Sequence, residues 1–118
     1  MTEPPDSGDF KPIADLDPVI HAPARLAIMT ALYVVEGADF VFLQKQTGLT
    51  RGNLSSHLSK LEAAGYITVE KKFVERVPRT LLKLTAHGSA AFLKYRAQLE
   101  QTLKKIGNEK QEIENKRQ

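Results

Sequence analysis

The sequence contains no cysteine, which excludes disulfide bonds, thiolate metal sites and cysteine nucleophiles. It also lacks any apolar run that approaches the roughly 18 residues of a membrane span, and we expect no contact with a membrane. The first ten residues, MTEPPDSGDF, are acidic and lack the apolar segment of a secretory signal, so we expect a cytoplasmic protein. The 118 residues that are present, 42% hydrophobic and 26% charged, suit one ordinary globular domain.

The charges are unevenly distributed, although their formal sum is only +3. Residues 1–17 carry five acids and one base, whereas residues 43–83 carry eight bases and three acids. A basic central segment indicates a surface that binds a polyanion, and a solvated basic face is at least as common. Because residues 1–17 also contain three prolines and a glycine, we expect them to form a flexible acidic arm.

Apolar periodicity predicts two helices in the first half of the chain. A dense apolar run predicts a helix over about residues 22–36, with Pro23 in its first turn and Gly37 at its end. The density of that run implies burial on several sides. Residues 40–42 either form a short strand or lead directly into a second helix over about residues 43–47.

A third helix is predicted after Thr50, whose hydroxyl can accept a backbone N–H from the first turn. Leu54, Leu58 and Leu61 recur at i, i+4 and i+7, which gives this helix a single buried stripe. Ala-Ala-Gly ending at Gly65 closes it. The period then changes to two, which predicts strands over residues 66–70 and 79–84 with a hairpin tip at 75–78.

A long helix is predicted over about residues 86–106, followed by a charged tail at 107–118. Apolar residues recur along it at a spacing of seven, which is typical of a helix–helix seam. This apolar row is longer than one compact domain can cover by itself. We therefore expect a second copy of the chain to cover the rest, which makes a homodimer. The predicted interface consists of Phe92, Tyr95, Leu99, Leu103 and Ile106.

Residues 43–61 read LQKQTGLTRGNLSSHLSKL, which is a short helix, a turn and a second helix with one buried stripe. This pattern predicts a helix-turn-helix, whose second helix enters the major groove of DNA. With the leucines buried, Gly52, Ser56, Ser59 and Lys60 lie on the opposite side. Arg51 and Asn53 lie at the exposed N-terminal end, where arginine can read guanine and asparagine can read adenine. The plainer interpretation is a solvated polar helix face.

The hairpin that follows favours the DNA interpretation. Four bases cluster around its tip, namely Lys71, Lys72, Arg76 and Arg79. A basic hairpin directly after a recognition helix is typical of a wing, which enters the minor groove or contacts phosphates. The predicted fold is therefore α+β and mainly helical. It is a winged helix-turn-helix over residues 18–106, with a two-stranded β-wing and a long C-terminal dimerisation helix.

Three segments resemble the winged helix-turn-helix transcriptional regulators of the MarR, PadR and ArsR type. They are HAPARL from His21, LTRGNLSSHLSKLEAAGYI across the recognition helix, and VPRTLLKLTAHG across the wing. The resemblance implies a DNA-binding homodimer, with Arg79 as the wing arginine. The groove-facing positions that it implies are Thr50, Arg51, Asn53, Ser55, Ser56 and His57. Gly52 departs from the family pattern, which often has a polar residue there.

Other functions have less support in the sequence. Ser55, Ser56 and His57 are helix neighbours that point about 100° apart, so we expect no enzyme active site. The three histidines are scattered and metal-sensing relatives use cysteines, so we expect no metal and no cofactor. The sequence does not decide whether a small-molecule effector binds, because the aromatic residues are as typical of a core or an interface as of a pocket. The alternative function is a winged-helix protein-interaction module that does not bind DNA.

Overall fold

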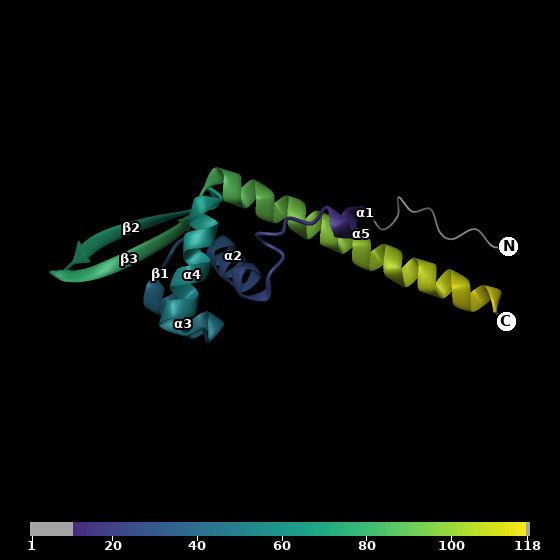
Figure 1. Ribbon diagram of the computed structural model, residues 1–118, viewed down its shortest axis with the longest axis horizontal. Coiled ribbons are helices and arrows are strands. Elements are labelled where there is room, and N and C mark those ends of the chain that lie inside the picture. The colour runs from purple at the N-terminus through teal and green to yellow at the C-terminus, as the bar shows by residue number, and fades with distance from the viewer. Residues whose placement is uncertain (1–10, 118) are drawn as a thin grey trace. The chain divides into compact units, whose positions relative to one another are not determined.

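The computed structural model describes residues 11–117 (Figure 1). Within this range the chain forms five helices and three strands. Asp17–Phe92 make up one compact unit, and residues 11–16 and 93–117 belong to a second. None of the helices in this described range is long and apolar enough to cross a membrane.

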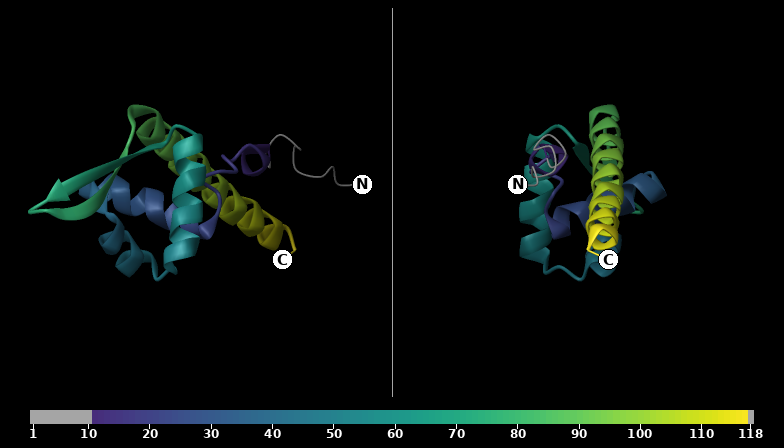
Figure 2. Two further views of the ribbon diagram at one scale, coloured as in Figure 1. Left: turned by 60° about the vertical axis from the view of Figure 1, so that its left-hand side comes forward. Right: turned by 90° about the vertical axis from the view of Figure 1, so that its right-hand side faces the viewer.

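The helices and strands follow one another in the order that the sequence predicts, with two additional short elements. They are α1 (Lys11–Ala14), α2 (Pro23–Val35), β1 (Ala38–Asp39), α3 (Phe40–Thr47), α4 (Arg51–Ala63), β2 (Ile67–Val74), β3 (Val77–Leu84) and α5 (Ala86–Lys116). The predicted winged helix-turn-helix is confirmed: α3 and α4 form the helix-turn-helix, and β2 and β3 form the wing. The wing projects beyond the helices of its unit (Figure 2).

The core of the Asp17–Phe92 unit lies where α2 meets α3, α4 and β3. Its fully buried side chains are Ile20, Ile28, Met29, Leu32, Leu43, Leu54, Leu61 and Leu82. The helix stripe predicted from the three leucines of α4 is thus buried against α2 and β2. Burial of each such side chain stabilises the fold by about 1.5–3 kcal/mol. This core fixes α4 so that its opposite side faces solvent.

Asp39 starts α3 earlier than the sequence indicates. Its side chain accepts a hydrogen bond from the Phe42 backbone N–H at 2.7 Å, which is the bond that an N-cap residue makes. Residues 40–42 are therefore the first turn of the helix and not a strand. The strand lies just before them, because β1 pairs antiparallel with β3. The sheet consequently has three strands in the order β1-β3-β2, whereas the sequence predicts two.

The wing is longer than predicted and its turn is tighter. The eight residues of β2 pair with the eight of β3, from Ile67 opposite Leu84 to Val74 opposite Val77. Only Glu75 and Arg76 connect the strands, with φ angles of 54° and 68°. Positive φ at both central residues is the geometry of a type I′ turn, whose twist matches that of the strands. Both residues adopt it without the help of a glycine.

The last residues of the predicted N-terminal arm include a short helix. The sequence predicts a flexible arm up to residue 17, but Lys11–Ala14 form α1 and Leu16 is buried. The Asp17 side chain accepts hydrogen bonds from the backbone N–H groups of Val19 and Ile20. These bonds fix the entry to α2. The remainder of the predicted arm lies outside the described residues.

The helix predicted over residues 86–106 is longer in the structure. Gly107 does not end α5, which continues to Lys116, so most of the predicted charged tail is helical. Two ion pairs at i, i+4 spacing join Lys110 to Glu114 at 3.8 Å and Glu112 to Lys116 at 3.7 Å. Opposite charges at this spacing each support a helix by a few tenths of a kcal/mol, about 0.2–0.5. These pairs offset part of the cost of the glycine.

Gly88, in the first turn of α5, is required by close packing. A Cβ at this position would lie 2.0 Å from the Tyr66 carbonyl oxygen and 2.9 Å from its Cα. Thr85 caps the same turn, because its hydroxyl accepts the Gly88 N–H at 2.9 Å. The start of α5 therefore lies directly against the backbone that leads from α4 into the wing.

Gly88→Ala should lower the free energy of unfolding by about 3 kcal/mol, because the added methyl group must displace backbone. Gly107→Ala is the matched control, since a Cβ there meets nothing within 4 Å. It should raise the free energy of unfolding by up to about 1 kcal/mol. Urea unfolding followed by far-ultraviolet circular dichroism measures both. Equal effects of the two substitutions would contradict the close packing at Gly88.

Candidate nucleic-acid interface

The exposed end of α4 is built by a helix cap. Thr50 Oγ1 accepts the Asn53 backbone N–H at 3.2 Å, as the sequence predicts for an N-cap residue. Arg51 follows directly, and its guanidinium carbon lies 5.7 Å from the centre of the Phe40 ring. A cation over an aromatic ring is attracted to its face. The first turn of α4 thus presents Arg51 and Asn53 from fixed backbone positions.

Residues of α4 divide into three sides. One is buried, one lines an open groove beside the wing, and one faces solvent. The core side carries Leu54, Leu58 and Leu61, of which Leu58 also reaches the groove. The groove side carries Arg51, Ser55, Ser59 and Glu62, and the outer side carries Gly52, Asn53, Ser56 and Lys60. Apart from Leu58, these groove and outer positions carry only polar side chains and glycine. Gly52 and the short side chains of Ser55, Ser56 and Ser59 let another molecule approach the helix closely between the longer charged side chains.

His57 lies apart from these exposed sides. Its side chain is half-buried, and its Nδ1 lies 3.2 Å from Nη1 of Arg25 on α2. Arg25 also donates through Nε to the Val19 carbonyl oxygen at 2.6 Å. Burial, together with the positive charges of Arg25 and Lys60, lowers the pKa of His57 below 6.5. His57 Nδ1 accepts the hydrogen bond in this contact, because a guanidinium can only donate.

The groove beside α4 has a volume of about 590 Å³. Asp39, Phe40 and Gln44 line it from the start of α3, and Lys71, Pro78, Arg79 and Thr80 line it from the wing. The groove thus joins the helix-turn-helix to the hairpin. Four of the predicted binding residues lie on its walls, namely Arg51, Ser55, Lys71 and Arg79.

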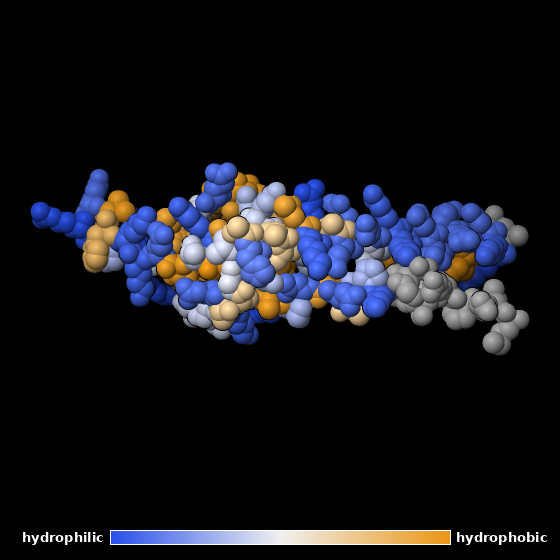
Figure 3. All heavy atoms as spheres, turned by 90° about the horizontal axis from the view of Figure 1, so that it is seen from above, coloured by the Kyte–Doolittle hydropathy of each residue, from blue (hydrophilic) through white to orange (hydrophobic). Residues whose placement is uncertain are grey.

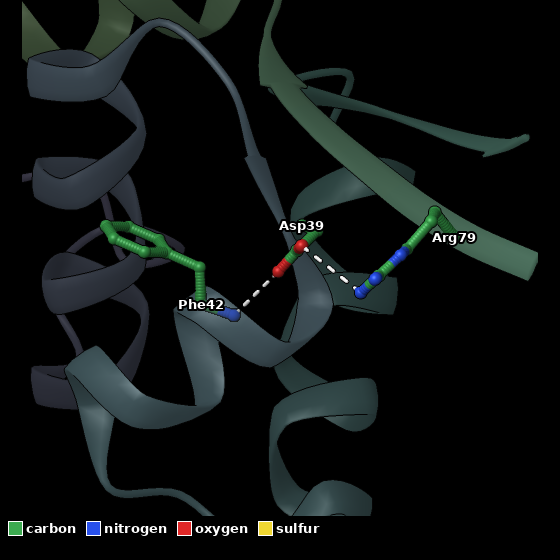
Figure 4. Close-up of polar contacts among 3 residues, drawn as sticks. All are labelled: Asp39, Phe42 and Arg79. Carbon is green, nitrogen blue, oxygen red and sulfur yellow. Dashed lines mark hydrogen bonds and ion pairs between the residues drawn. The ribbon is translucent and has the colours of Figure 1, made fainter. Parts of the chain in front are cut away.

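Asp39 connects the wing to α3 (Figure 4). One carboxylate oxygen accepts the Phe42 N–H, and the other lies 3.9 Å from Nη1 of Arg79. The Asp39 and Arg79 side chains are 39% and 49% exposed, so solvent screens this ion pair strongly. Arg79 is therefore held only weakly and can exchange Asp39 for another anion.

The other bases of the wing are exposed. Lys72 Nζ lies 3.2 Å from the Glu70 carboxylate on the same strand. Lys71 and Thr80 are cross-strand partners on the side that lines the groove. Arg76 is part of the turn itself. The wing therefore presents four bases near its end, as the sequence predicts, and a neighbouring carboxylate on the same strand pairs with Lys72.

The residues predicted for a dimer interface divide into two groups. Phe92 and Tyr95 are buried within the single chain, and the Phe92 ring stacks on Tyr33 at 5.1 Å between centroids. Burial raises the pKa of Tyr95. Leu103 and Ile106 are exposed by 59% and 47%, and Leu99 is half-buried. Only this second group is accessible to another chain.

Metal ligands do not gather in the part of the chain that the structure describes. No three His, Asp or Glu side chains among residues 11–117 lie close enough together to hold an ion. His57 contacts Arg25, and the His87 ring lies 5.1 Å from the ring of Tyr66.

Two residues of the site are missed by reasoning from the sequence. The sequence places Arg25 in the first helix without a role, and nothing local indicates that it meets His57 32 residues later. Asp39 has a detectable signal, because an aspartate directly before a helix is a preferred N-cap residue. Its contact with Arg79 depends on the pairing of β1 with β3, which the sequence does not reveal.

Asp39→Ala should lower the free energy of unfolding by about 1 kcal/mol, because α3 loses its N-cap. Asp39→Asn should leave it nearly unchanged, since asparagine caps equally well and the exposed ion pair contributes little. Urea unfolding of the two variants distinguishes the contributions of cap and charge. A loss in Asp39→Asn as large as that in Asp39→Ala would show that the ion pair, and not the cap, stabilises this end of the groove.

Comparisons with known proteins place this geometry in a family. Residues 24–103 match the family described as the winged helix DNA-binding domain. An uncharacterized protein of Methanocaldococcus jannaschii is 33% identical over 88 residues, which are 75% of this chain and 96% of that protein.

Solved structures show the same fold. A transcriptional regulator homologue from Pyrococcus horikoshii is 30% identical and superposes with a TM-score of 0.77, covering 84% of this chain and 97% of that one. A regulator of the MarR family from Enterococcus faecalis shares the fold at 20% identity, with a TM-score of 0.67 over 94% of this chain and 96% of that one. The resemblance found in the helix-turn-helix and wing sequences is confirmed: this chain belongs to the winged helix DNA-binding domain family.

Proposed function

We propose that this protein is a cytoplasmic transcriptional regulator that binds specific sequences of duplex DNA. The observation that carries the proposal is the pairing of a polar α4 face with a basic wing on the two walls of one groove. Membership of the winged helix DNA-binding domain family supports it. So does the Pyrococcus horikoshii structure, which is that of a transcriptional regulator homologue.

The exposed first turn of α4 has the chemistry needed to read bases. Asn53 and Arg51 lie in the first turn, where a recognition helix meets base edges in the major groove. Asparagine can bond adenine in bidentate fashion, and arginine can bond guanine. Gly52 leaves open space beside them, since a Cβ there meets nothing within 4 Å. The small Ser56 side chain continues this surface along the helix.

The wing has the chemistry needed to hold the backbone. Its bases are exposed, and contacts of exposed bases with phosphates raise affinity without reading sequence. Arg79 is held by Asp39 across 3.9 Å only, so a phosphate can take the place of that carboxylate. Thr50 and Lys60 flank the reading residues on α4 and serve as further phosphate contacts. His57 is half-buried and turned toward Arg25, so it contributes little to this surface.

Asn53→Ala should relax the sequence preference, at a cost of about 1–3 kcal/mol on the selected site and little on random duplex. Arg79→Ala should instead weaken binding to all duplexes and reduce the salt slope by about one. Lys94→Ala, an exposed base outside the proposed interface, is the control and should change neither. Fluorescence anisotropy of labelled duplexes, selected from genomic fragments, measures affinity and salt dependence.

Loss of affinity on both duplexes in Asn53→Ala would assign Asn53 to phosphate and not to base reading. A protein that retains its fold but binds no duplex at low salt would contradict the function itself. The alternative, a winged-helix protein-interaction module, would then be favoured.

We further propose that the regulator is a homodimer that binds an inverted repeat. Four accessible apolar residues of α5 recur at helical spacing, namely Leu99, Leu103, Ile106 and Ile113, and the last three are 44–59% exposed. An apolar row of this kind marks an interface. A two-fold pair of winged domains presents two recognition helices to half-sites about one DNA turn apart.

Leu103→Glu and Ile106→Glu should each convert the dimer to a monomer, because a charge must then be buried without a partner. Lys104→Glu is the matched control on an exposed neighbouring position and should leave the dimer intact. Sedimentation equilibrium at tens of micromolar measures the state of each. A monomeric unmodified protein, or a Leu103→Glu protein that remains dimeric, would contradict this interface.

A further inference from the structure

The end of the wing is apolar as well as basic. Phe73 is 79% exposed, and Val74 and Val77 beside it are 53% and 48% exposed. Among the large hydrophobic residues that the structure describes, none is more exposed than Phe73. Seen from above, tan and orange spheres lie among blue ones at the wing tip, on the left of Figure 3. An apolar group so far from the core contributes little to folding.

Phe73 lies on the α4 side of the wing. Side chains alternate between the two faces of a strand, so Phe73 shares a face with Lys71, two residues before it. Its cross-strand partner Pro78 projects from that face too. Both Lys71 and Pro78 line the groove beside α4. Phe73 therefore extends the groove wall outward, whereas Val74 and its partner Val77 lie on the opposite face.

The charges around Phe73 indicate what kind of molecule the wing tip binds. Residues 71–79 contain four bases and one acid, so a polyanion is attracted to this hairpin. A turn of only two residues makes the tip narrow. The minor groove of DNA is about 6 Å wide, which admits side chains from such a tip. Apolar side chains that enter this groove can insert between base steps, and the adjacent basic side chains of the protein then contact the phosphates.

We propose that Phe73, supported by Pro78, is an apolar wedge that enters the DNA minor groove beside the segment held by α4. The proposal rests on the proposed function, because it concerns the same DNA duplex. The ring stacks against a base step, while Lys71 and Arg79 contact the phosphates on either side. The wedge favours flexible pyrimidine–purine steps, which open at the lowest cost. The wing thereby contributes to sequence preference without a hydrogen bond to a base.

A single tryptophan tests where the wing tip lies, since the chain contains none. In Phe73→Trp, binding of the selected duplex should quench the fluorescence and shield the indole from acrylamide, because the ring stacks on bases. Val74→Trp is the matched control, one residue away on the opposite face, and should stay accessible in the complex. Anisotropy of the labelled duplex shows independently that each complex has formed.

Phe73→Ala provides a second test that uses no probe. It should lower affinity for the selected duplex by about fivefold or more, a loss comparable to that of one stacked base. The salt slope should not change, because an apolar contact releases no counterions. Val74→Ala should leave both quantities unchanged. An equal loss in both variants, or a smaller salt slope in Phe73→Ala, would overturn the wedge.

The outcomes separate the two proposals. If the Phe73→Trp variant forms the complex while its indole stays accessible to acrylamide, the wedge is overturned and DNA binding stays intact. Failure of the unmodified protein to bind any duplex overturns both. If that indole becomes shielded as protein concentration rises without DNA, a second copy of the chain occupies the tip and the wedge is wrong.

Discussion

The backbone of Tyr66 is the point on which the arrangement of α4, the wing and the start of α5 depends. Its N–H donates to the Leu61 carbonyl oxygen at 3.0 Å, which closes the end of α4. Its own carbonyl oxygen accepts the Thr85 N–H at 3.0 Å, which joins the two ends of the wing. Gly88 packs against the same carbonyl group with no room for a side chain. One residue's backbone thus fixes where the recognition helix ends and where the hairpin begins.

The side chain of Tyr66 strengthens this junction. Its hydroxyl donates to the Asp17 carboxylate, and the same carboxylate group accepts the N–H groups that lead into α2. Burial, followed by the hydrogen bond to Asp17 and the negative charge of Asp17, raises the pKa of Tyr66 to about 12. The hydroxyl is therefore protonated and remains a donor throughout the neutral range. As a result, the direction of the wing relative to α4 is set by buried and hydrogen-bonded groups, and the exposed bases of the wing are free to serve binding.

The sequence predicts the parts of this fold that depend on local patterns. The leucine stripe of α4, its Thr50 cap and the two wing strands are all found, because hydrophobic period and capping are properties of neighbouring residues. Boundaries that depend on tertiary contacts are predicted less well. The two-residue strand β1 exists only through its pairing with β3, and Gly107 stays helical. The importance of Gly88 arises from Tyr66, which lies in an earlier segment of the chain.

The candidate site follows the same division. Exposure of the α4 and wing residues could be predicted, since helix and strand periods place them opposite the core. Two contacts could not be predicted from the sequence, namely that of His57 with Arg25 and that of Asp39 with Arg79. Each joins two segments that are distant in sequence. The α5 residues show why period alone is insufficient. Phe92 and Leu103 belong to one predicted seam. Phe92, however, is buried against Tyr33 within the chain, whereas Leu103 is exposed.

The wing turn gives a physical reason to regard the tip as a functional surface. Non-glycine residues in the left-handed region cost about 1–2 kcal/mol each, and both Glu75 and Arg76 occupy it. Asn-Gly would form this turn at lower cost. The chain instead places a base at the turn and an exposed phenylalanine shortly before it. Neither choice favours the stability or the solubility of a free hairpin. Both are explained if the tip contacts a groove that has negative charge along its edges and apolar surface at its floor, as the minor groove of DNA has with its phosphates and stacked bases.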